Sequence, residues 1–153
     1  MSTTAATSAT EVAIRRASSA DADGVFALVA QLSETYDVER SAFDAAFEDA
    51  VEHPTRNVLL VAENGDRILG YALMTVARLM YTRADAAQIQ ELIVDEGHRG
   101  LGIGSRLVWA VEDICLELGL QQLTVASSRA PAFYDRLDFR STADYLKKVF
   151  RSE

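Results

Sequence analysis

Hydrophobic and polar positions along the chain follow two patterns, one with the two-residue period of a strand and one with the period of a helix. Runs rich in Val, Ile, Leu, Tyr and Phe, several of them alternating with polar residues, predict about seven strands. These are residues 12–15, 57–63, 67–78, 87–94 and 123–125, the position of Phe139, and residues 145–149. Asn64-Gly65 separates the second and third strands, and this pair is a strong hairpin signal because both residues tolerate positive φ.

Four other segments carry apolar residues at helical spacing. The expected helices begin after residues 18–21, at Ser41, at Gly104 and at Pro131. Asp44 lies at capping-box spacing from Ser41, and Pro54 ends that helix. Gly119 closes the third helix as a C′ residue.

The elements follow the order β, α, α, β, β, β, α, β, α, β, β, a hairpin-built antiparallel half followed by a βαβ unit. We therefore expect an α/β fold with a mixed central sheet of about seven strands flanked by about four helices. A chain of 153 residues corresponds to one domain. We expect that domain to span residues 11–153. The first ten residues, rich in Ser, Thr and Ala, are expected to form a disordered tail.

Composition excludes several classes of function. Fifteen basic and 23 acidic residues give a net charge of −8, so the average field of the protein repels nucleic acid and anionic membranes. No apolar run approaches the ~18–20 residues that a bilayer span needs. A single cysteine and two isolated histidines provide neither an internal disulfide nor a metal site. With no secretory signal in the sequence, we expect a cytoplasmic protein.

One segment, residues 94–104, lies between the predicted fourth strand and the third helix and is rich in glycine. Glycines at 100, 102 and 104 let successive backbone N–H groups point into one concavity, and the first turn of the helix adds unpaired donors and a positive dipole end. Such a nest suits a pyrophosphate, and Arg99 can add a neutralising charge at its rim. The nest explains how an acidic protein could hold an anion.

Three phosphate-binding patterns compete for this segment. A Walker loop requires Gly-Lys followed by Ser or Thr, whereas here Ser105 and Arg106 follow Gly104. A dinucleotide fingerprint requires glycines at its first, third and sixth positions, and no frame of the segment provides them. The third pattern fits: the stretch resembles the acetyl-CoA signature of the GNAT superfamily of N-acetyltransferases, Arg/Gln-x-x-Gly-x-Gly/Ala, matched by Arg99, Gly102 and Gly104. The remaining alternative is a glycine-rich turn without a ligand.

A second stretch, residues 130–139, is similar to another GNAT signature, Ala-x-x-Phe-Tyr-x-x-x-Gly-Phe, and lies at the family's distance from the first. The element order from residue 11 to residue 150 also resembles the GNAT fold. Two positions depart from the family pattern. Asp138 replaces the usual Gly before Phe139, although Asp is one of the few residues that visit the left-handed region. Ser128 lies where the family often carries an Asn that contacts the pantetheine arm.

The resemblance implies how an acetyl group would pass to an amine. The backbone N–H of Val94 would stabilise the thioester oxygen, and Tyr134 would protonate the departing thiolate as general acid. Glu91 would accept the proton of the amine as general base. A core tyrosine at position 134 and an exposed strand glutamate at position 91 are the structural alternatives.

The resemblance also implies two sets of binding residues. The set expected to bind acetyl-CoA consists of Ile93, Val94, Arg99, Gly100, Leu101, Gly102, Ile103, Gly104, Ser105, Ser128 and Phe133. In this family the link between the first two helices lines the acceptor pocket, and acidic and aromatic residues suit a cationic amine. The acceptor set is therefore Glu34 and Tyr36, together with Tyr81 from the turn before the central strand. Solvated loops are the alternative for these three residues.

Together these patterns predict an N-acetyltransferase that moves an acetyl group from acetyl-CoA to a primary amine of a small molecule or protein, by direct transfer in a ternary complex. The rival hypotheses are a transferase of another acyl group, a catalytically silent acyl-CoA-binding regulatory module, and a protein-binding domain with an empty nest. The resemblance further implies a homodimer, for which the alternation at residues 145–150 offers a strand edge. Fold alone does not identify the acceptor.

Overall fold

The computed structural model describes residues 11–32, 37–127 and 130–151. Its strands are β1 (Ala13–Arg16), β2 (Asn57–Asn64), β3 (Arg67–Ala77), β4 (Ala86–Val94) and β5 (Gln122–Val125). Its α-helices are α1 (Ala22–Val29), α2 (Arg40–Glu52), α3 (Ile103–Glu117) and α4 (Pro131–Asp135). Short 3₁₀ turns occupy Ser19–Asp21, Ala30–Leu32 and Glu96–His98.

The five strands form one sheet in the order β1-β2-β3-β4-β5. Neighbours are antiparallel from β1 to β4, whereas β4 and β5 run parallel, so the sheet is mixed as predicted. The hairpin predicted at Asn64-Gly65 joins β2 to β3, with Gly65 at a φ of 61°. The α/β class and the order of the elements through α4 are confirmed.

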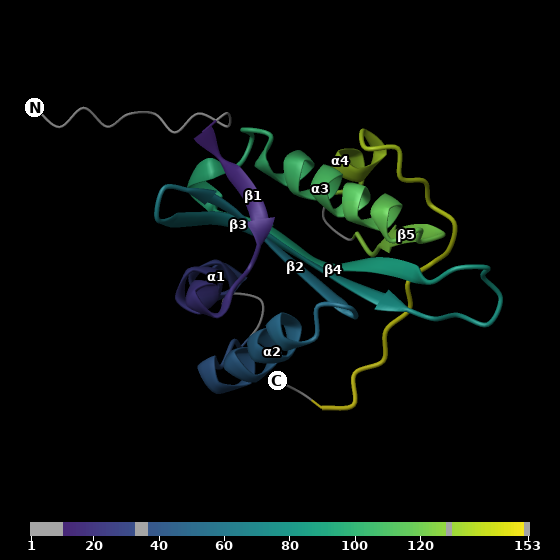
Figure 1. Ribbon diagram of the computed structural model, residues 1–153, viewed down its shortest axis with the longest axis horizontal. Helices are drawn as coiled ribbons and strands as arrows, with labels where there is room; N and C mark the ends of the chain where they lie inside the picture. The colour runs from purple at the N-terminus through teal and green to yellow at the C-terminus, as the bar shows by residue number, and fades with distance from the viewer. Residues whose placement is uncertain (1–10, 33–36, 128–129, 152–153) are drawn as a thin grey trace, which may run out of the picture.

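Helices cover both faces of the sheet. Figure 1 shows α1 and α2 on one face and α3 and α4 on the other. Alternation along β2 divides its side chains between the two layers: Val58, Leu60 and Ala62 face α3, while Leu59 and Val61 face α1 and α2. Two hydrophobic clusters result, called here the α3-side cluster and the α1–α2-side cluster.

Helix α3 is the element that the sequence predicted best. Leu107, Val108 and Val111 are completely buried, as their helical spacing predicts. The helix ends in a Schellman motif: Leu120 N donates to Cys115 O at 2.9 Å, and Gly119 lies in the left-handed region with a φ of 67°. The glycine nest and this cap therefore fix the two ends of α3.

The start of α1 is anchored by a buried carboxylate. Asp21 is 7% exposed, and its two oxygens each accept a hydrogen bond of 2.8 Å from the Arg15 guanidinium. Arg15 also bonds to Glu63 at 2.9 Å, and Ser18 N donates to Asp21 Oδ2 at 2.8 Å. This network joins α1 to β1 and β2.

The prediction for the start of α2 was wrong in detail. The helix begins at Arg40, with Glu39 at the N-cap position, rather than at Ser41. The expected capping box does not form, because Ser41 Oγ donates to the Glu39 carboxylate and Asp44 accepts from Arg40 Nε at 2.8 Å. Arg40 forms ion pairs with both Asp23 and Asp44, so the Asp44 carboxylate is bound to Arg40 and does not form the expected capping box.

The strand count was also overestimated: the described residues contain five strands, not about seven. Neither Phe139 nor residues 145–149 form a strand. The apolar side chains of the last segment are largely exposed, at 72% for Tyr145, 63% for Val149 and 89% for Phe150. Alternation alone does not make a strand, because a strand also needs a partner strand. Residues 145–149 do not pair with β5, which remains the edge of the sheet.

Candidate active site

The glycine nest has the geometry that its sequence predicts. Gly100 and Gly102 both lie in the left-handed region, with φ of 80° and 82°, and Gly102 is the N-cap of α3. The first hydrogen bond of the helix runs from Arg106 N to Gly102 O at 3.1 Å. The N–H groups of residues 103–105 therefore precede the helical ladder and are oriented out of its first turn. Arg99, directly before Gly100, is exposed.

Side chains of the nest contribute less than its backbone. Ile103 is 1% exposed and Ile93 is 8% exposed, so both are core residues whose backbone alone could reach a ligand. Leu101, by contrast, is 42% exposed. The Nε of Arg99 donates to Val94 O at 3.3 Å, which ties this side chain to the end of β4.

The end of β4 presents backbone groups on the side away from β3. Asp95 N donates to Leu69 O across the ladder at 2.8 Å. Because bonded and non-bonded pairs alternate along an antiparallel ladder, the N–H and C=O of the preceding Val94 point away from β3. β5 pairs with β4 only as far as Ile89 opposite Val125. The Val94 N–H therefore lies on a strand edge that β5 leaves unpaired.

A bulge in β4 determines where Glu91 points. Leu73 lies opposite Glu91 while Met74 lies opposite Ile89, so Gln90 is the extra residue. Ile89 packs in the α3-side cluster, whereas Glu91 bonds to a residue of the α1–α2-side cluster. Without the bulge, Glu91 would share the face of Ile89. The irregularity thus directs the carboxylate to the face of the sheet under α1 and α2.

A buried tyrosine that no sequence pattern marked holds Glu91 in place. Tyr71 Oη donates to Glu91 Oε1 at 2.8 Å, and Tyr71 is only 2% exposed. Burial, together with the neighbouring carboxylate, raises the pKa of Tyr71 far above its ordinary value, so the phenol stays a donor. Glu91 itself is exposed, and its second oxygen has no partner among the described residues.

Helix α4 brings Tyr134 to the opposite face. Pro131 occupies the first turn of α4, as predicted, and the Phe133 ring packs on the first turn of α3. A Cβ at Gly104 would stand 3.3 Å from this ring, so glycine permits the close approach. Tyr134 is half-buried between the rings of Phe133 and Phe139, with centroids 4.9 and 5.6 Å away. Burial raises the pKa of Tyr134, which keeps its phenol protonated at neutral pH.

Asp138 closes the turn that follows α4. Its φ is 66°, and Phe139 N donates to Tyr134 O at 3.1 Å across this turn. An Asp can therefore occupy the left-handed position that the family usually gives to Gly. The turn fixes Phe139 against Tyr134 and so helps to orient the phenol.

Not all predicted residues are brought together. Tyr81 is 80% exposed in the loop between β3 and β4, at the end of β4 remote from Val94 (Figure 1). The structure therefore does not bring Tyr81 to the nest. Glu34, Tyr36 and Ser128 lie outside the described residues.

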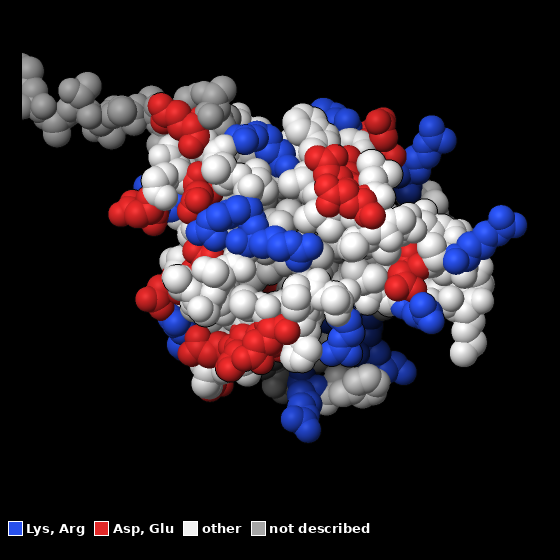
Figure 2. Space-filling model, in the orientation of Figure 1, with Lys and Arg blue, Asp and Glu red and all other residues white. Residues whose placement is uncertain are grey.

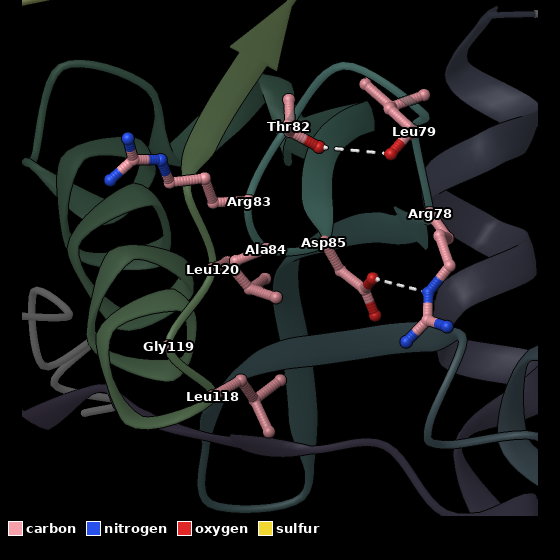
Figure 3. A pocket seen from close by; sticks show the side chains of 9 residues that line it. All are labelled: Arg78, Leu79, Thr82, Arg83, Ala84, Asp85, Leu118, Gly119 and Leu120. Carbon is pink, nitrogen blue, oxygen red and sulfur yellow. Dashed lines mark hydrogen bonds and ion pairs between the residues drawn. The ribbon is translucent and has the colours of Figure 1, made fainter.

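Two hollows in the described part of the chain do not include the nest, although Gln31 and Asp95 line one of them. One of about 410 Å³ lies between the β3–β4 loop and the end of α3 (Figure 3). Its Arg78 pairs with Asp85 at 3.3 Å, while Arg83 points away on the other side, so the two arginines do not converge on one anion. The other, of about 470 Å³, lies between α1 and the β2–β3 turn. Neither is lined by residues 99–105, by Glu91 or by Tyr134.

Within residues 11–32, 37–127 and 130–151, no group of three or more His, Cys, Asp or Glu side chains is arranged to hold a metal ion. In the same residues no helix is both long and apolar enough to cross a membrane. On the face that Figure 2 shows, Lys and Arg side chains lie among Asp and Glu rather than in one continuous basic surface.

Comparisons with known proteins identify the family of the chain. The model of the acetyltransferase (GNAT) family matches residues 26–139. A protein of Oryza sativa subsp. japonica, probable glucosamine 6-phosphate N-acetyltransferase 2, is 31% identical over 135 residues, which are 84% of this chain and 81% of the rice protein.

Solved structures resemble the whole fold. Glucosamine-6-phosphate N-acetyltransferase from Arabidopsis thaliana gives a TM-score of 0.80 at 23% identity, over 92% of this chain and 99% of that one. A transcriptional regulator from Bacillus halodurans C-125 gives a TM-score of 0.82 at 26% identity, over 91% of this chain and 99% of that one. The family model covers most of the chain and includes both the nest and Tyr134. The chain is therefore an acyltransferase that belongs to the GNAT family of acetyltransferases, a family that uses acetyl-CoA.

Proposed function

We propose that the chain is an N-acetyltransferase that passes the acetyl group of acetyl-CoA directly to the primary amine of a small molecule. The observation that carries this proposal is the edge of β4 beside the nest, with Tyr134 on the α3–α4 face and Glu91 on the α1–α2 face. A strand edge accepts an extended arm through backbone hydrogen bonds. A thioester lying along this edge would meet an acid from one face and a base from the other.

The residues of the nest fit the pyrophosphate of acetyl-CoA. Residues 103–105 offer their backbone N–H groups, and a Cβ at Gly100 or Gly102 would meet no atom within 4 Å, so the concavity is open. Arg99 uses its Nε on Val94 O, which leaves its terminal nitrogens for a phosphate oxygen.

Each proposed catalytic group has one task. Acetyl-CoA supplies a thioester, and the Val94 N–H donates to the oxygen on which negative charge develops. Glu91 accepts the proton that the amine loses, through the oxygen that Tyr71 leaves unbound. Tyr134 gives its proton to the departing sulfur, as the C–N bond forms and the C–S bond breaks. Direct transfer is favoured because the single cysteine, Cys115, is buried in the α3-side cluster.

We infer a small amine as acceptor, with an amino-sugar phosphate as the first compound to test. The support is the similarity to the rice protein, named a probable glucosamine 6-phosphate N-acetyltransferase, which spans most of both chains.

The proposal includes a homodimer joined through residues 139–151. This segment leaves α4 and runs past the end of the sheet towards α2 (Figure 1). Its Tyr145, Leu146, Val149 and Phe150 side chains are 63–89% exposed. A second copy would cover them, and the outer edge of β5 has no partner strand among the described residues. Light scattering that gives the mass of a monomer at high micromolar concentration would contradict the dimer.

The test of function is release of free thiol from acetyl-CoA with a panel of amines, followed by mass spectrometry of the products. The panel contains glucosamine 6-phosphate, glucosamine, a polyamine, an aminoglycoside and a peptide with a free N-terminus. We expect turnover with a small amine and the highest kcat/KM with glucosamine 6-phosphate. Propionyl-CoA and succinyl-CoA test the acyl preference. Binding of CoA without thiol release from any combination of acyl-CoA and amine would identify the chain as a catalytically silent acyl-CoA-binding module and overturn the proposal.

A further inference from the structure

Asp95, the first residue after β4, is the centre of a polar cluster directly before the nest. Its Oδ2 accepts from Gly97 N at 3.2 Å and lies 2.6 Å from His98 Nδ1. Its backbone carbonyl accepts from His98 N at 2.9 Å. The side chains of Asp95 and His98 are only 14% and 15% exposed. The carboxylate therefore fixes the 3₁₀ turn Glu96–His98 immediately ahead of Arg99.

A glutamine from a distant part of the chain completes this cluster. Gln31 lies in the 3₁₀ turn Ala30–Leu32 after α1, and its Nε2 donates to Asp95 Oδ1 at 2.7 Å. Its Oε1 accepts from the backbone N–H of Glu96 at 3.2 Å. A single amide thus bonds two consecutive residues of the loop with both of its polar ends. The turn before the nest is tied to α1 on the other face of the sheet.

We propose that Gln31 and Asp95 are positioning residues, whose clamp holds residues 96–99 so that the nest of residues 99–105 is preformed for the pyrophosphate of acetyl-CoA. The inference rests on the proposed placement of CoA at that nest. A loop without the clamp would sample conformations in which its N–H groups do not converge. Ordering such a loop on binding opposes affinity, whereas a preformed loop avoids this loss.

The contacts of Asp95 also explain how a carboxylate is tolerated beside an anion-binding nest. An unshielded negative charge there would repel the pyrophosphate. Both carboxylate oxygens of Asp95 are instead engaged, Oδ1 by Gln31 and Oδ2 by Gly97 and His98. The hydrogen bond with His98, followed by that from Gln31, holds the pKa of Asp95 below its ordinary value. Arg67, 3.9 Å away, places a positive charge beside the carboxylate.

The chain offers a matched control for the glutamine. Gln121 also uses its amide to tie a distant loop, since its Oε1 accepts from Arg83 N at 2.8 Å. It lies beyond the opposite end of the fifteen-residue α3, about 20 Å from the nest. Gln31→Met and Gln121→Met each remove one amide and keep the length of the side chain.

Calorimetry with CoA and with ADP, which shares the pyrophosphate, measures the effect, and thermal unfolding checks the fold. Gln31→Met should raise the Kd of both ligands by roughly tenfold, the size that one hydrogen bond to a charged group supports. Gln121→Met should leave both values unchanged. With an active acceptor, Gln31→Met should raise KM for acetyl-CoA and leave kcat at saturation unchanged.

Asp95→Asn provides a second, opposed readout. If Asp95 is a positioning residue, the substitution should weaken CoA binding. If Asp95 acts only as a negative charge beside the nest, the substitution should tighten CoA binding. Tighter binding, or equal CoA affinity in folded Gln31→Met and wild type, would overturn the clamp. Wild-type protein that bound neither CoA nor ADP would instead refute the placement at the nest, and with it the proposed function.

Discussion

Replacing Gly102 by valine separates the ligand-binding role of the nest from the stability of the helix that it begins. Gly102 and Gly119 lie at opposite ends of α3 with φ of 82° and 67°, and a Cβ at either position meets no atom within 4 Å. Both substitutions therefore carry backbone strain of about 1–2 kcal/mol or more without a steric clash. For a chain of this length, each should lower Tm by roughly 2–8 °C.

Only Gly102 belongs to the nest, so only its substitution should affect the ligand. The valine side chain should block the close approach of the pyrophosphate to the backbone. We expect the Kd of CoA to rise at least tenfold, or about 1.4 kcal/mol, in Gly102→Val and to stay unchanged in Gly119→Val. Calorimetry with thermal unfolding measures both quantities. Unchanged CoA affinity in a folded Gly102→Val variant would refute the placement, and equal losses in both variants would show that affinity merely follows stability.

Three further predictions concern single side chains. Tyr134→Phe should lower kcat by ~10²-fold or more with CoA affinity unchanged, because it removes the proton donor and keeps the ring; full turnover in steady-state assays would exclude the phenol as acid. Glu91→Gln should lower the rate of acetyl transfer most at low pH, where the amine is still protonated, and Tyr71→Phe should have the same effect more weakly. A loss of rate in Glu91→Gln that does not depend on pH would make the Glu91 carboxylate structural. Asp21→Asn should cost about 1.5–3 kcal/mol of unfolding free energy at pH 7, since Asp21 accepts hydrogen bonds from charged Arg15. The hydrogen bonds from Arg15 lower the pKa of Asp21 in the folded state. This stabilisation is therefore present above the unfolded-state pKa of about 4, and it disappears as the pH falls through the folded-state pKa. Urea unfolding should therefore show the two proteins converging in acid, and a difference that persists there would contradict the ion pair.

Local signals predicted the parts of the fold that short stretches of chain determine. The apolar spacing of α3, the hairpin at Asn64-Gly65 and the left-handed Asp138 depend only on near neighbours in the sequence, and all are present. The two final strands depend on a partner, which alternation at residues 145–149 cannot supply.

The same distinction applies to the candidate site. The nest was predicted because glycine spacing determines backbone geometry locally. The direction of Glu91 depends on the bulge at Gln90, and its partner Tyr71 comes from the neighbouring strand. His98 is mostly buried against Asp95, which also accepts a hydrogen bond from the distant Gln31. Such contacts between distant residues leave no periodic trace in one sequence.

The most direct test of the central claim is a crystal structure of the protein with CoA bound. The account predicts the pyrophosphate on the N–H groups of residues 103–105 beside Arg99, the pantetheine arm along the edge of β4 at Val94, and the sulfur next to Tyr134. A pyrophosphate bound instead in the hollow between α1 and the β2–β3 turn, or an arm that leaves the Val94 N–H unbound, would contradict it.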